Sequence, residues 1–372
     1  MSVNLYNKLE PETGYKLLQL SDDLLDAFQT GPVKFKALSS DAGNVVLCSE
    51  DKTWVIKQRN HSNTVILMNE FAPIEGIPED KINTFGLPRP GADWAGFSTL
   101  DSELEPRLVD GSIDVTQLDI YHGKDVPLTR KLTLQEFKDR CPCSEKEFVS
   151  KWFEVGGSVV QGFACLLSER FMLKALHIIL ISCMAENLDV DSLSIDKVAD
   201  VLAKDVKEGE PNLYTHEVVT TVINKFGFKV ESAETAPDDV RFRINMPLIA
   251  RWYGVSALKK FAAKEPISED EFMIQWKGQF PPYFHCDLDI CMLRGYFVRP
   301  LTNKIRYMSR TTLSLDAKER FKQLFHWQST WEQADMIPYI SDLNTKNLKI
   351  DTFIIKYARR KRVGNKVIIS AR

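Results

Sequence analysis

The residues whose chemistry is plainest in this sequence are basic, and they gather near its end. From residue 346 onward nine side chains are positively charged and Asp351 is the only acid, so this segment carries a net charge of +8. The whole chain carries −3, which leaves −11 for residues 1–345. Lysine and arginine bind phosphate groups and release condensed counterions when they do. The asymmetry predicts one end directed at nucleic acid and a remainder that is not.

The candidate DNA contacts lie around one predicted helix end, and they are Lys356, Arg359, Arg360, Lys361, Arg362 and Lys366. Asp351 is placed to cap a helix with Phe353 and Tyr357 on one face, Gly364 interrupts the chain, and residues 366–369 have the pattern of a strand. We expect the basic residues to end a recognition helix, followed by a basic wing. Two other interpretations stay open, a solvated helix end and a nuclear localisation signal, and the second is compatible with DNA binding.

Motifs of catalysis are missing from the sequence. A phosphate loop needs the pattern G-x-x-x-x-G-K-[ST], and Gly156-Gly157-Ser158 lacks the lysine that would reach a phosphate. No cysteine or serine lies in a local nucleophile signature, and His61 is expected to be a hydrogen-bonding turn residue. We therefore expect no enzyme activity and no cofactor.

Metal binding is not predicted either. Cys141-Pro142-Cys143 has no second cysteine pair nearby, and His285, Cys286 and Cys291 offer three ligands within one short stretch. Structural zinc takes four ligands, usually from two separated pairs. The seven cysteines are an odd number spread over a long chain, which favours free thiols in a reducing compartment.

Length and composition are those of a soluble protein with several domains. The chain has 372 residues, 44% of them apolar and 27% charged, and it is too long for one ordinary core. Charged residues interrupt its densest apolar stretch, residues 163–184, so no membrane span is expected. Residues 1–10 lack the pattern of a secretory signal.

Residues 1–123 are expected to form a small β-barrel-like module. Short strands are predicted at residues 33–37, 45–48, 53–58 and 64–68. Residues 59–63 are expected to be a polar turn, and residues 101–110 an acidic loop. Few of these strands are long enough to close a barrel, so an open edge is expected to accept a strand from another chain.

The rest of the chain alternates predicted helices with short strands. After a connector at residues 124–144, the order of helices followed by a β ribbon recurs in three segments, residues 145–246, 247–310 and 311–372. Residues 163–185 and 287–296 are each expected to be helical. The predicted fold class is α+β, a small β-barrel-like module followed by three tandem winged-helix domains.

Several stretches resemble the family of the sister-chromatid-cohesion subunit of the alternative clamp loader, its fungal members most. They are Lys52-Thr53-Trp54-Val55-Ile56-Lys57-Gln58-Arg59, His61-Ser62-Asn63-Thr64-Val65, Trp252-Tyr253-Gly254, Phe280-Pro281-Pro282, Met292-Leu293-Arg294-Gly295-Tyr296, Asp316-Ala317-Lys318-Glu319-Arg320-Phe321 and Ile355-Lys356-Tyr357-Ala358-Arg359-Arg360-Lys361-Arg362. They run in the expected order across nearly the whole chain, and residues 100–143 match least.

The resemblance implies a nuclear, non-catalytic subunit of a replication-factor-C-like complex that loads or unloads PCNA and supports cohesion. The implied partners are the complex's small subunit, the C-terminal tail of its large subunit, the catalytic subunit of DNA polymerase epsilon, and DNA, single- or double-stranded. The N-terminal module would join the two subunits and dock on the polymerase, while the winged helices bind DNA. The candidate partner contacts are Trp54, Ile56, Lys57, Arg59, His61 and Val65, for which a solvated hairpin is the alternative.

Two other functions stay open. Winged helices often serve sequence-specific transcription regulators, although base readout needs arginine or asparagine side chains directed into a groove. A protein-only scaffold is the other, and it would show no salt-sensitive affinity for DNA.

Overall fold

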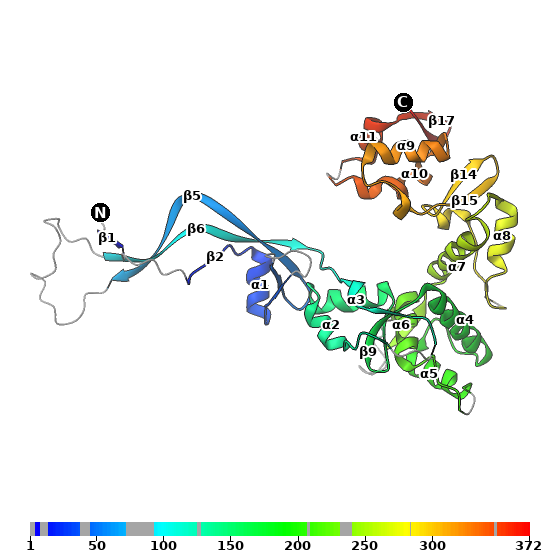
Figure 1. Ribbon diagram of the computed structural model, residues 1–372, viewed down its shortest axis with the longest axis horizontal. Helices are drawn as coiled ribbons and strands as arrows, with labels where there is room; N and C mark the ends of the chain where they lie inside the picture. The colour runs from blue at the N-terminus through cyan, green and yellow to red at the C-terminus, as the bar shows by residue number, and fades with distance from the viewer. Residues whose placement is uncertain are drawn as a thin grey trace, which may run out of the picture. The chain divides into compact units, whose positions relative to one another are not determined.

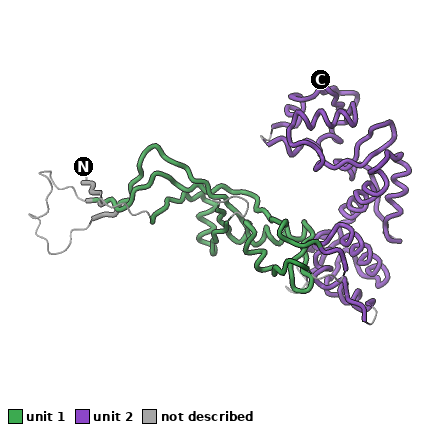
Figure 2. The backbone as a smooth tube through the Cα atoms, viewed as in Figure 1, with its two compact units in different colours: residues 1–120, 127–166 green, residues 121–126, 167–372 purple. Residues whose placement is uncertain are grey.

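The structure is a computed structural model that describes residues 4–7, 14–37, 45–71, 93–124, 128–206, 209–230, 240–282, 284–345 and 348–372. Helices and small sheets alternate along most of the chain, so the predicted α+β class is confirmed (Figure 1). Contacts divide the chain into two compact units (Figure 2). The first comprises residues 1–120 and 127–166, and the second comprises residues 121–126 and 167–372.

The first unit begins with a curled, open sheet of the order β1-β6-β5-β4-β3, in which β2 also pairs with β6. Its elements are β1 (Asn4–Asn7), β2 (Leu17–Leu18), α1 (Asp22–Thr30), β3 (Lys34–Ala37), β4 (Val45–Cys48), β5 (Thr53–Phe71) and β6 (Asp93–Val109). Leu24 of α1, Leu47 and Trp54 form its small buried core. Because β3 has only β4 as a neighbour among the described strands, its other edge is open.

The long ribbon of β5 and β6 corrects two predictions (Figure 1). Residues 59–63 are strand and not a turn, and residues 101–110 are nearly all strand and not a loop. Pairing runs from Thr53↔Val109 to Asn60↔Ser102, shifts register, and resumes at Val65↔Leu100. The side chains of residues 57–60 are exposed, so no buried face imposes the apolar alternation by which a strand is recognised.

Residues 124–144, expected to be a connector, contain the helix α2 (Leu134–Arg140). Thr133 caps it in a reciprocal capping box with Glu136. Phe137 is 1% exposed and packs with Cys141 and neighbouring residues into a core. The prediction gave weight to the flanking prolines and missed the capping box.

Four three-stranded sheets follow one another along the chain. In each of them the strand that comes last in the sequence lies in the centre, and their orders are β7-β9-β8, β10-β12-β11, β13-β15-β14 and β16-β18-β17. The first set contains β7 (Asp119–Tyr121), α2, α3 (Glu145–Val155), β8 (Gly157–Val160) and β9 (Phe163–Leu167). The second contains α4 (Glu169–Ala185), β10 (Leu193–Ser194), α5 (Ile195–Lys204), α6 (His216–Phe226), β11 (Gly227–Val230) and β12 (Arg241–Ile244).

The third set contains α7 (Met246–Phe261), β13 (Ile267–Ser268), α8 (Glu269–Lys277), the 3-10 turn η3 (Ile290–Leu293), β14 (Phe297–Leu301) and β15 (Lys304–Tyr307). The fourth contains α9 (Ala317–Trp327), β16 (Thr330–Glu332), α10 (Gln333–Ile340), the 3-10 turn η5 (Ser341–Leu343), α11 (Ile350–Tyr357), β17 (Arg359–Val363) and β18 (Lys366–Ser370). In each set a short first strand precedes helical segments, and a hairpin closes the sheet.

The repeating order therefore occurs four times in the described residues, where three copies were predicted. Residues 163–185 are not one helix, because Ser168 ends the strand β9 and caps α4, its Oγ accepting from the Phe171 N–H at 3.3 Å. This break separates the expected first segment, residues 145–246, into parts of two sheets. Residues 287–296 are also not a helix and contain only η3.

Candidate nucleic-acid interface

The basic run at the end of the chain lies on a β-hairpin and not on a helix end. The helix α11 ends at Tyr357, β17 carries the run, and Gly364 turns the chain into β18 with φ +59°. Five consecutive residue pairs join the two strands, from Arg359↔Ser370 to Val363↔Lys366. Arginine and lysine are good helix formers, and tertiary pairing with β18 overrides that preference here. The predicted strand at residues 366–369 is confirmed as part of β18.

Asp351 does not cap α11, as had been expected. It lies in the first turn of the helix, and the residue before the helix, Lys349, makes no side-chain cap. The Asp351 carboxylate instead accepts from Gln333 Nε2 at 2.8 Å and pairs with Arg360 at 3.1 Å. It therefore ties the basic hairpin to α10 and α11.

Two of the six candidate DNA contacts are already engaged. Arg360 pairs with Asp351 and also donates from Nε to Gln333 Oε1 at 3.1 Å. Lys366 pairs with Glu332 of β16. These two side chains attach the hairpin to its own domain, and their contact with DNA stays a prediction.

The other four candidates are exposed and available. Among the described residues, none forms an ion pair or side-chain hydrogen bond with Lys356, Arg359 or Lys361. Arg362 donates from Nε to the Gly364 carbonyl at 3.3 Å, within its own hairpin. Since side chains alternate along a strand, Arg359 and Lys361 share one face of β17. Three uncompensated cations, Arg359, Lys361 and Arg362, therefore lie on the exposed edge strand β17, and Lys356 adds a fourth from the last turn of α11.

A buried core supports this basic hairpin. Ile369 of β18, with Phe353 and Ile354 of α11, packs into the core of the last domain. Arg320 of α9 is also buried, at 1% exposed, and its NH1 lies 2.7 Å from Asp342 Oδ1. An arginine inside the stretch of residues 316–321 that resembles the cohesion family therefore serves the core and not a ligand.

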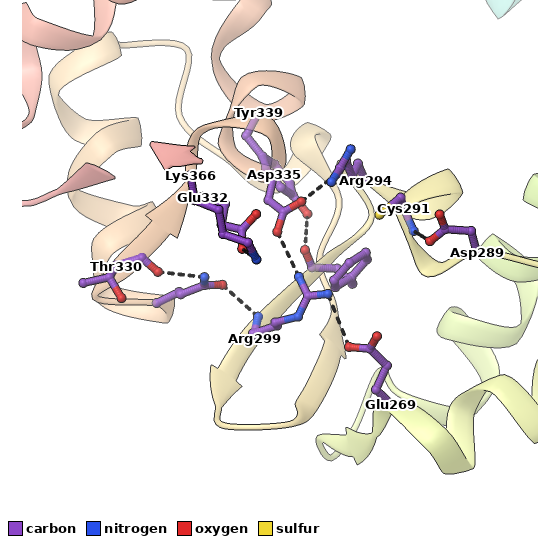
Figure 3. Close-up of polar contacts among 12 residues, drawn as sticks. Glu269, Asp289, Cys291, Arg294, Arg299, Thr330, Glu332, Asp335, Tyr339 and Lys366 are labelled. Atoms are coloured by element: carbon purple, nitrogen blue, oxygen red, sulfur yellow. Dashed lines mark hydrogen bonds and ion pairs between the residues drawn. The ribbon is translucent and has the colours of Figure 1, made fainter. Parts of the chain in front are cut away.

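A polar cluster holds the third small sheet to the fourth (Figure 3). Asp335 of α10 accepts from Arg294 Nε at 2.7 Å and from Arg299 NH1 at 2.9 Å. Arg299 NH2 also pairs with Glu269 at 3.3 Å, and the Tyr339 hydroxyl donates to the Phe297 carbonyl at 2.8 Å. We call these contacts the Asp335 brace. Because an arginine from the turn before β14 and one from β14 bind the same carboxylate, the brace fixes α10 against β14.

The predicted partner contacts are divided between the core and the surface of the first unit. Trp54 is 1% exposed in the core with Leu24 and Leu47, so it is not a surface contact as had been supposed. Ile56 packs against this core and is half-buried, while Lys57 is exposed. The tryptophan belongs to the folding of the module.

The remaining partner candidates lie on the ribbon. Arg59 NH1 is 3.6 Å from Glu103 Oε1, and His61 Nε2 is 3.4 Å from Glu103 Oε2 without hydrogen-bond alignment. Val65 is half-buried where the register resumes. His61 is thus a strand residue beside an acid of β6, and the contact role of the ribbon residues stays a prediction.

Glu147 of α3 is a residue that the sequence analysis missed. Its carboxylate accepts from Thr53 Oγ1 at 2.6 Å, from the Gly111 N–H at 3.0 Å and from Ser144 Oγ at 2.7 Å. Burial raises the pKa of this carboxyl, but the hydrogen bonds from Thr53, Gly111 and Ser144 outweigh it and leave the pKa below its ordinary value. Ser144-x-x-Glu147 is a capping box, a signal that was present in the sequence.

The thiols and acids of the described residues are not arranged for metal chemistry. No group of three or more His, Cys, Asp or Glu side chains among them is placed to hold a metal ion. Burial raises the pKa of Cys143 to about 11 and that of Cys141 to about 12, so both thiols are protonated at neutral pH. None of the described helices has the length and apolarity that a membrane crossing requires.

Comparison with known proteins identifies the family of the chain. The family described as "Sister chromatid cohesion protein Dcc1" matches residues 15–340. The protein named "Sister chromatid cohesion protein DCC1" from Saccharomyces cerevisiae is 44% identical over 385 aligned positions, which cover 100% of both chains. The protein of the same name from Xenopus tropicalis is 25% identical, in an alignment that covers 93% of this chain and 86% of that protein. The one from Homo sapiens is 24% identical, in an alignment that covers 84% of this chain and 77% of that protein.

The family match begins inside the curled sheet and extends through the Asp335 brace to the end of α10, and the full-length yeast alignment also includes the basic hairpin. None of these descriptions names an enzyme. The chain belongs to the Dcc1 family of sister chromatid cohesion proteins.

Proposed function

We propose that this chain is a non-catalytic subunit acting in sister chromatid cohesion, and that it binds DNA through its last domain. The observation that carries the proposal is the exposed edge strand β17, where Arg359, Lys361 and Arg362 meet no acid among the described residues. An uncompensated row of cations on a hairpin suits the phosphates of a duplex. Membership of the Dcc1 family supplies the link to cohesion.

The four small sheets support a winged-helix interpretation of the domains that carry this surface. A winged helix joins helices to a short first strand and closes with a hairpin, which is the order that each set repeats. In this arrangement the basic hairpin of β17 and β18 is the wing of the last domain. The preceding helix α11 would lie beside the same stretch of DNA, so Lys356 extends the contact.

The open sheet of the first unit is the proposed site of assembly with partner subunits. Its edge strand β3 carries Phe35, which is 64% exposed. An exposed apolar residue on an unpaired edge favours strand addition by another chain. We propose that this edge joins the small subunit and the C-terminal tail of the large subunit of a replication-factor-C-like clamp loader. The assembled complex would dock on DNA polymerase epsilon in the nucleus and act on PCNA.

A salt titration of duplex binding tests the DNA proposal. The full chain should bind duplexes of unrelated sequence with equal affinity, and log Kobs should fall with log salt at a slope of about −3 to −4, because three or four phosphates are neutralised. Replacing Arg359, Lys361 and Arg362 with glutamate should abolish most binding and flatten the slope, with the melting temperature unchanged.

The matched control replaces three exposed lysines elsewhere in the second unit, Lys197, Lys204 and Lys264, with glutamate. It changes the net charge equally, so it should reduce affinity only through long-range repulsion. Equal losses in both variants would contradict a specific role for the hairpin. Enrichment of one motif from random duplexes would favour a transcription regulator, and absence of salt-sensitive binding would favour a protein-only scaffold.

A further inference from the structure

A cavity beside the helix α4 in the second unit is lined with basic side chains. Its volume is about 690 Å³, within the range of pockets that hold a small ligand or part of a larger one. Its basic and imidazole lining residues are His122, Lys124, Arg170, Lys174 and His177. Among the described residues that line it, none is acidic. The cavity therefore concentrates positive charge well away in sequence from the basic hairpin.

The cations of this cavity lack partners within the protein. Lys124, Arg170 and Lys174 are exposed, and no described residue forms an ion pair or side-chain hydrogen bond with them. The neighbouring Glu169 does not compensate them, because its Oε2 is held by Lys259 Nζ at 2.5 Å. Arg170 also lies in the first turn of α4, where the helix dipole favours acids over bases. A bound anion would offset both unfavourable features.

The spacing of these residues suits a linear polyanion better than a single ion. Arg170, Lys174 and His177 occupy positions i, i+4 and i+7 of α4 and so share one face of the helix. They are spaced by about 6 Å and about 4.5 Å along the helix axis. Lys124 lines the same cavity from a separate segment, the one that follows β7. Burial lowers the pKa of His177, so this imidazole lines the cavity without adding a charge at neutral pH. The cations Arg170 and Lys174 at successive turns of α4, together with Lys124, match a strand with regularly repeated phosphates.

The floor of the cavity argues against two other ligands. Phe171 and Tyr253 are only 4% and 2% exposed. Phe171 is stacked on Tyr214 with centroids 5.9 Å apart, and the Tyr253 hydroxyl is 3.1 Å from His177 Nδ1. These rings are already packed, so they cannot stack a base or anchor an apolar peptide side chain. The cations are therefore the groups that bind the ligand, and they contact phosphates without distinguishing one base sequence from another.

We propose that the cavity beside α4 is a second phosphate-binding site, which takes the backbone of a nucleic-acid strand regardless of its bases. This inference rests on the proposed DNA binding and extends the footprint from the hairpin of β17 and β18 to the cavity beside α4. Two separate sites on one chain make binding depend on simultaneous contact by both, which raises affinity beyond that of either site.

The test uses the full chain and a fluorescently labelled oligothymidylate, followed by anisotropy over a salt series. Replacing Arg170 and Lys174 with glutamine should lower affinity about tenfold at low salt and reduce the log–log slope by about 1.4, since each contact on a single strand contributes about 0.7. The control replaces Lys197 and Lys204 of α5 with glutamine, which removes the same charge and should leave the slope unchanged. All four replaced side chains are exposed, so the melting curves of both variants should coincide with that of the wild type. A second variant replaces Arg170 and Lys174 with glutamate and so reverses both charges.

The possible results separate this inference from the proposed function. If the hairpin variant loses DNA binding while the glutamine variant of Arg170 and Lys174 keeps the wild-type slope, the second site is wrong and the DNA function stands. If the wild-type chain shows no salt-sensitive binding to any nucleic acid, both fail. A polyglutamate peptide serves as the alternative ligand. If replacing Arg170 and Lys174 weakens binding of this peptide but leaves the affinity for oligothymidylate unchanged, the cavity binds acidic protein and the inference is overturned.

Discussion

At the scale of single residues, the charges of this chain divide into those that hold the protein together and those left for a ligand. Arg320 looks like a surface base in the sequence, yet it is buried against Asp342. Arg360 and Lys366 belong to the predicted DNA contacts, yet acids of their own domain engage them. Sequence shows that a residue is charged, but its partner comes from a distant element. Replacing the acidic partner of a buried arginine lowers the free energy of unfolding, by about 3–5 kcal/mol for a fully buried pair.

Glu147 provides the sharpest test at this scale. Replacing it with glutamine keeps the shape of the side chain but removes the charge that three donors share, so the first unit should lose about 1–3 kcal/mol of stability at neutral pH. Because the folded pKa lies below its ordinary value of 4.5, this stabilisation is present above that value and is lost as pH falls through the folded pKa. The difference between wild type and variant should therefore shrink below about pH 4.

Chemical denaturation at a series of pH values measures this difference. Glu145→Gln is the matched control, since Glu145 lies in the same first turn and pairs with Lys138 at 3.3 Å near the surface. Its loss should cost less than about 1 kcal/mol. A Glu147→Gln penalty that stays constant down to pH 3 would show that packing, and not charge, stabilises this site.

At the scale of elements, the turn before β14 shows how closely two sets of helices and strands approach. Gly295 has φ +89°, and a Cβ placed on it would lie 2.8 Å from Pro338 Cβ of α10. Gly209 has φ +86° with nothing within 4 Å of such a Cβ. Both replacements by alanine carry the cost of a left-handed backbone, about 1–2 kcal/mol. Only Gly295→Ala also pushes α10 away from the Asp335 brace.

The expected result is a larger destabilisation for Gly295→Ala than for Gly209→Ala, by about 1–3 kcal/mol. Hydrogen exchange should show the excess as faster exchange of amides in α10 and β14. Equal penalties for the two alanine variants, with unchanged protection of α10, would mean that Pro338 relaxes without cost and that the contact between these elements is loose.

The element scale also shows what sequence could and could not predict. The strands β3, β4 and β18 follow from local signals and were expected. The predicted strands at residues 53–58 and 64–68 are confirmed as parts of β5. Their continuity through residues 59–63 and the strand over most of residues 101–110 were not expected, because the exposed polar residues there carry no amphipathic signature. Residues 359–362 have helical propensity, but they form a strand because they pair with β18 in the folded domain. Ser168 is a typical helix-capping residue, but the apolar residues on both sides of it masked the boundary between β9 and α4 in the sequence.

At the scale of the whole molecule, the boundary of the first unit differs from the predicted module. Lys36 Nζ donates to the carbonyls of Cys141 and Cys143 at 3.1 and 2.9 Å, and the Lys146 N–H donates to the Glu50 carbonyl at 3.0 Å. These bonds tie the sheet to α2 and α3. The curled sheet is therefore only part of a folded unit that continues to residue 166.

Truncation tests this boundary. A fragment of residues 1–120 lacks the bonds to α2 and α3 and keeps open strand edges, so we expect it to aggregate or to melt without cooperativity. A fragment of residues 1–166 should be more soluble and should show a cooperative transition by circular dichroism. If the shorter fragment melts as cooperatively as the longer one, α2 and α3 are accessories to an independently stable sheet.

The charged edge strand β17 has a consequence for the behaviour of the molecule in solution. An unpaired strand edge is a template on which a second copy can add, and rows of lysine or arginine prevent that growth through mutual repulsion. All five residues of β17 are exposed, and four of them are arginine or lysine. The same cations that we assign to phosphate contact thus act as gatekeepers against self-association. Polyanions that neutralise them without covering the backbone would be expected to promote clustering of the free chain.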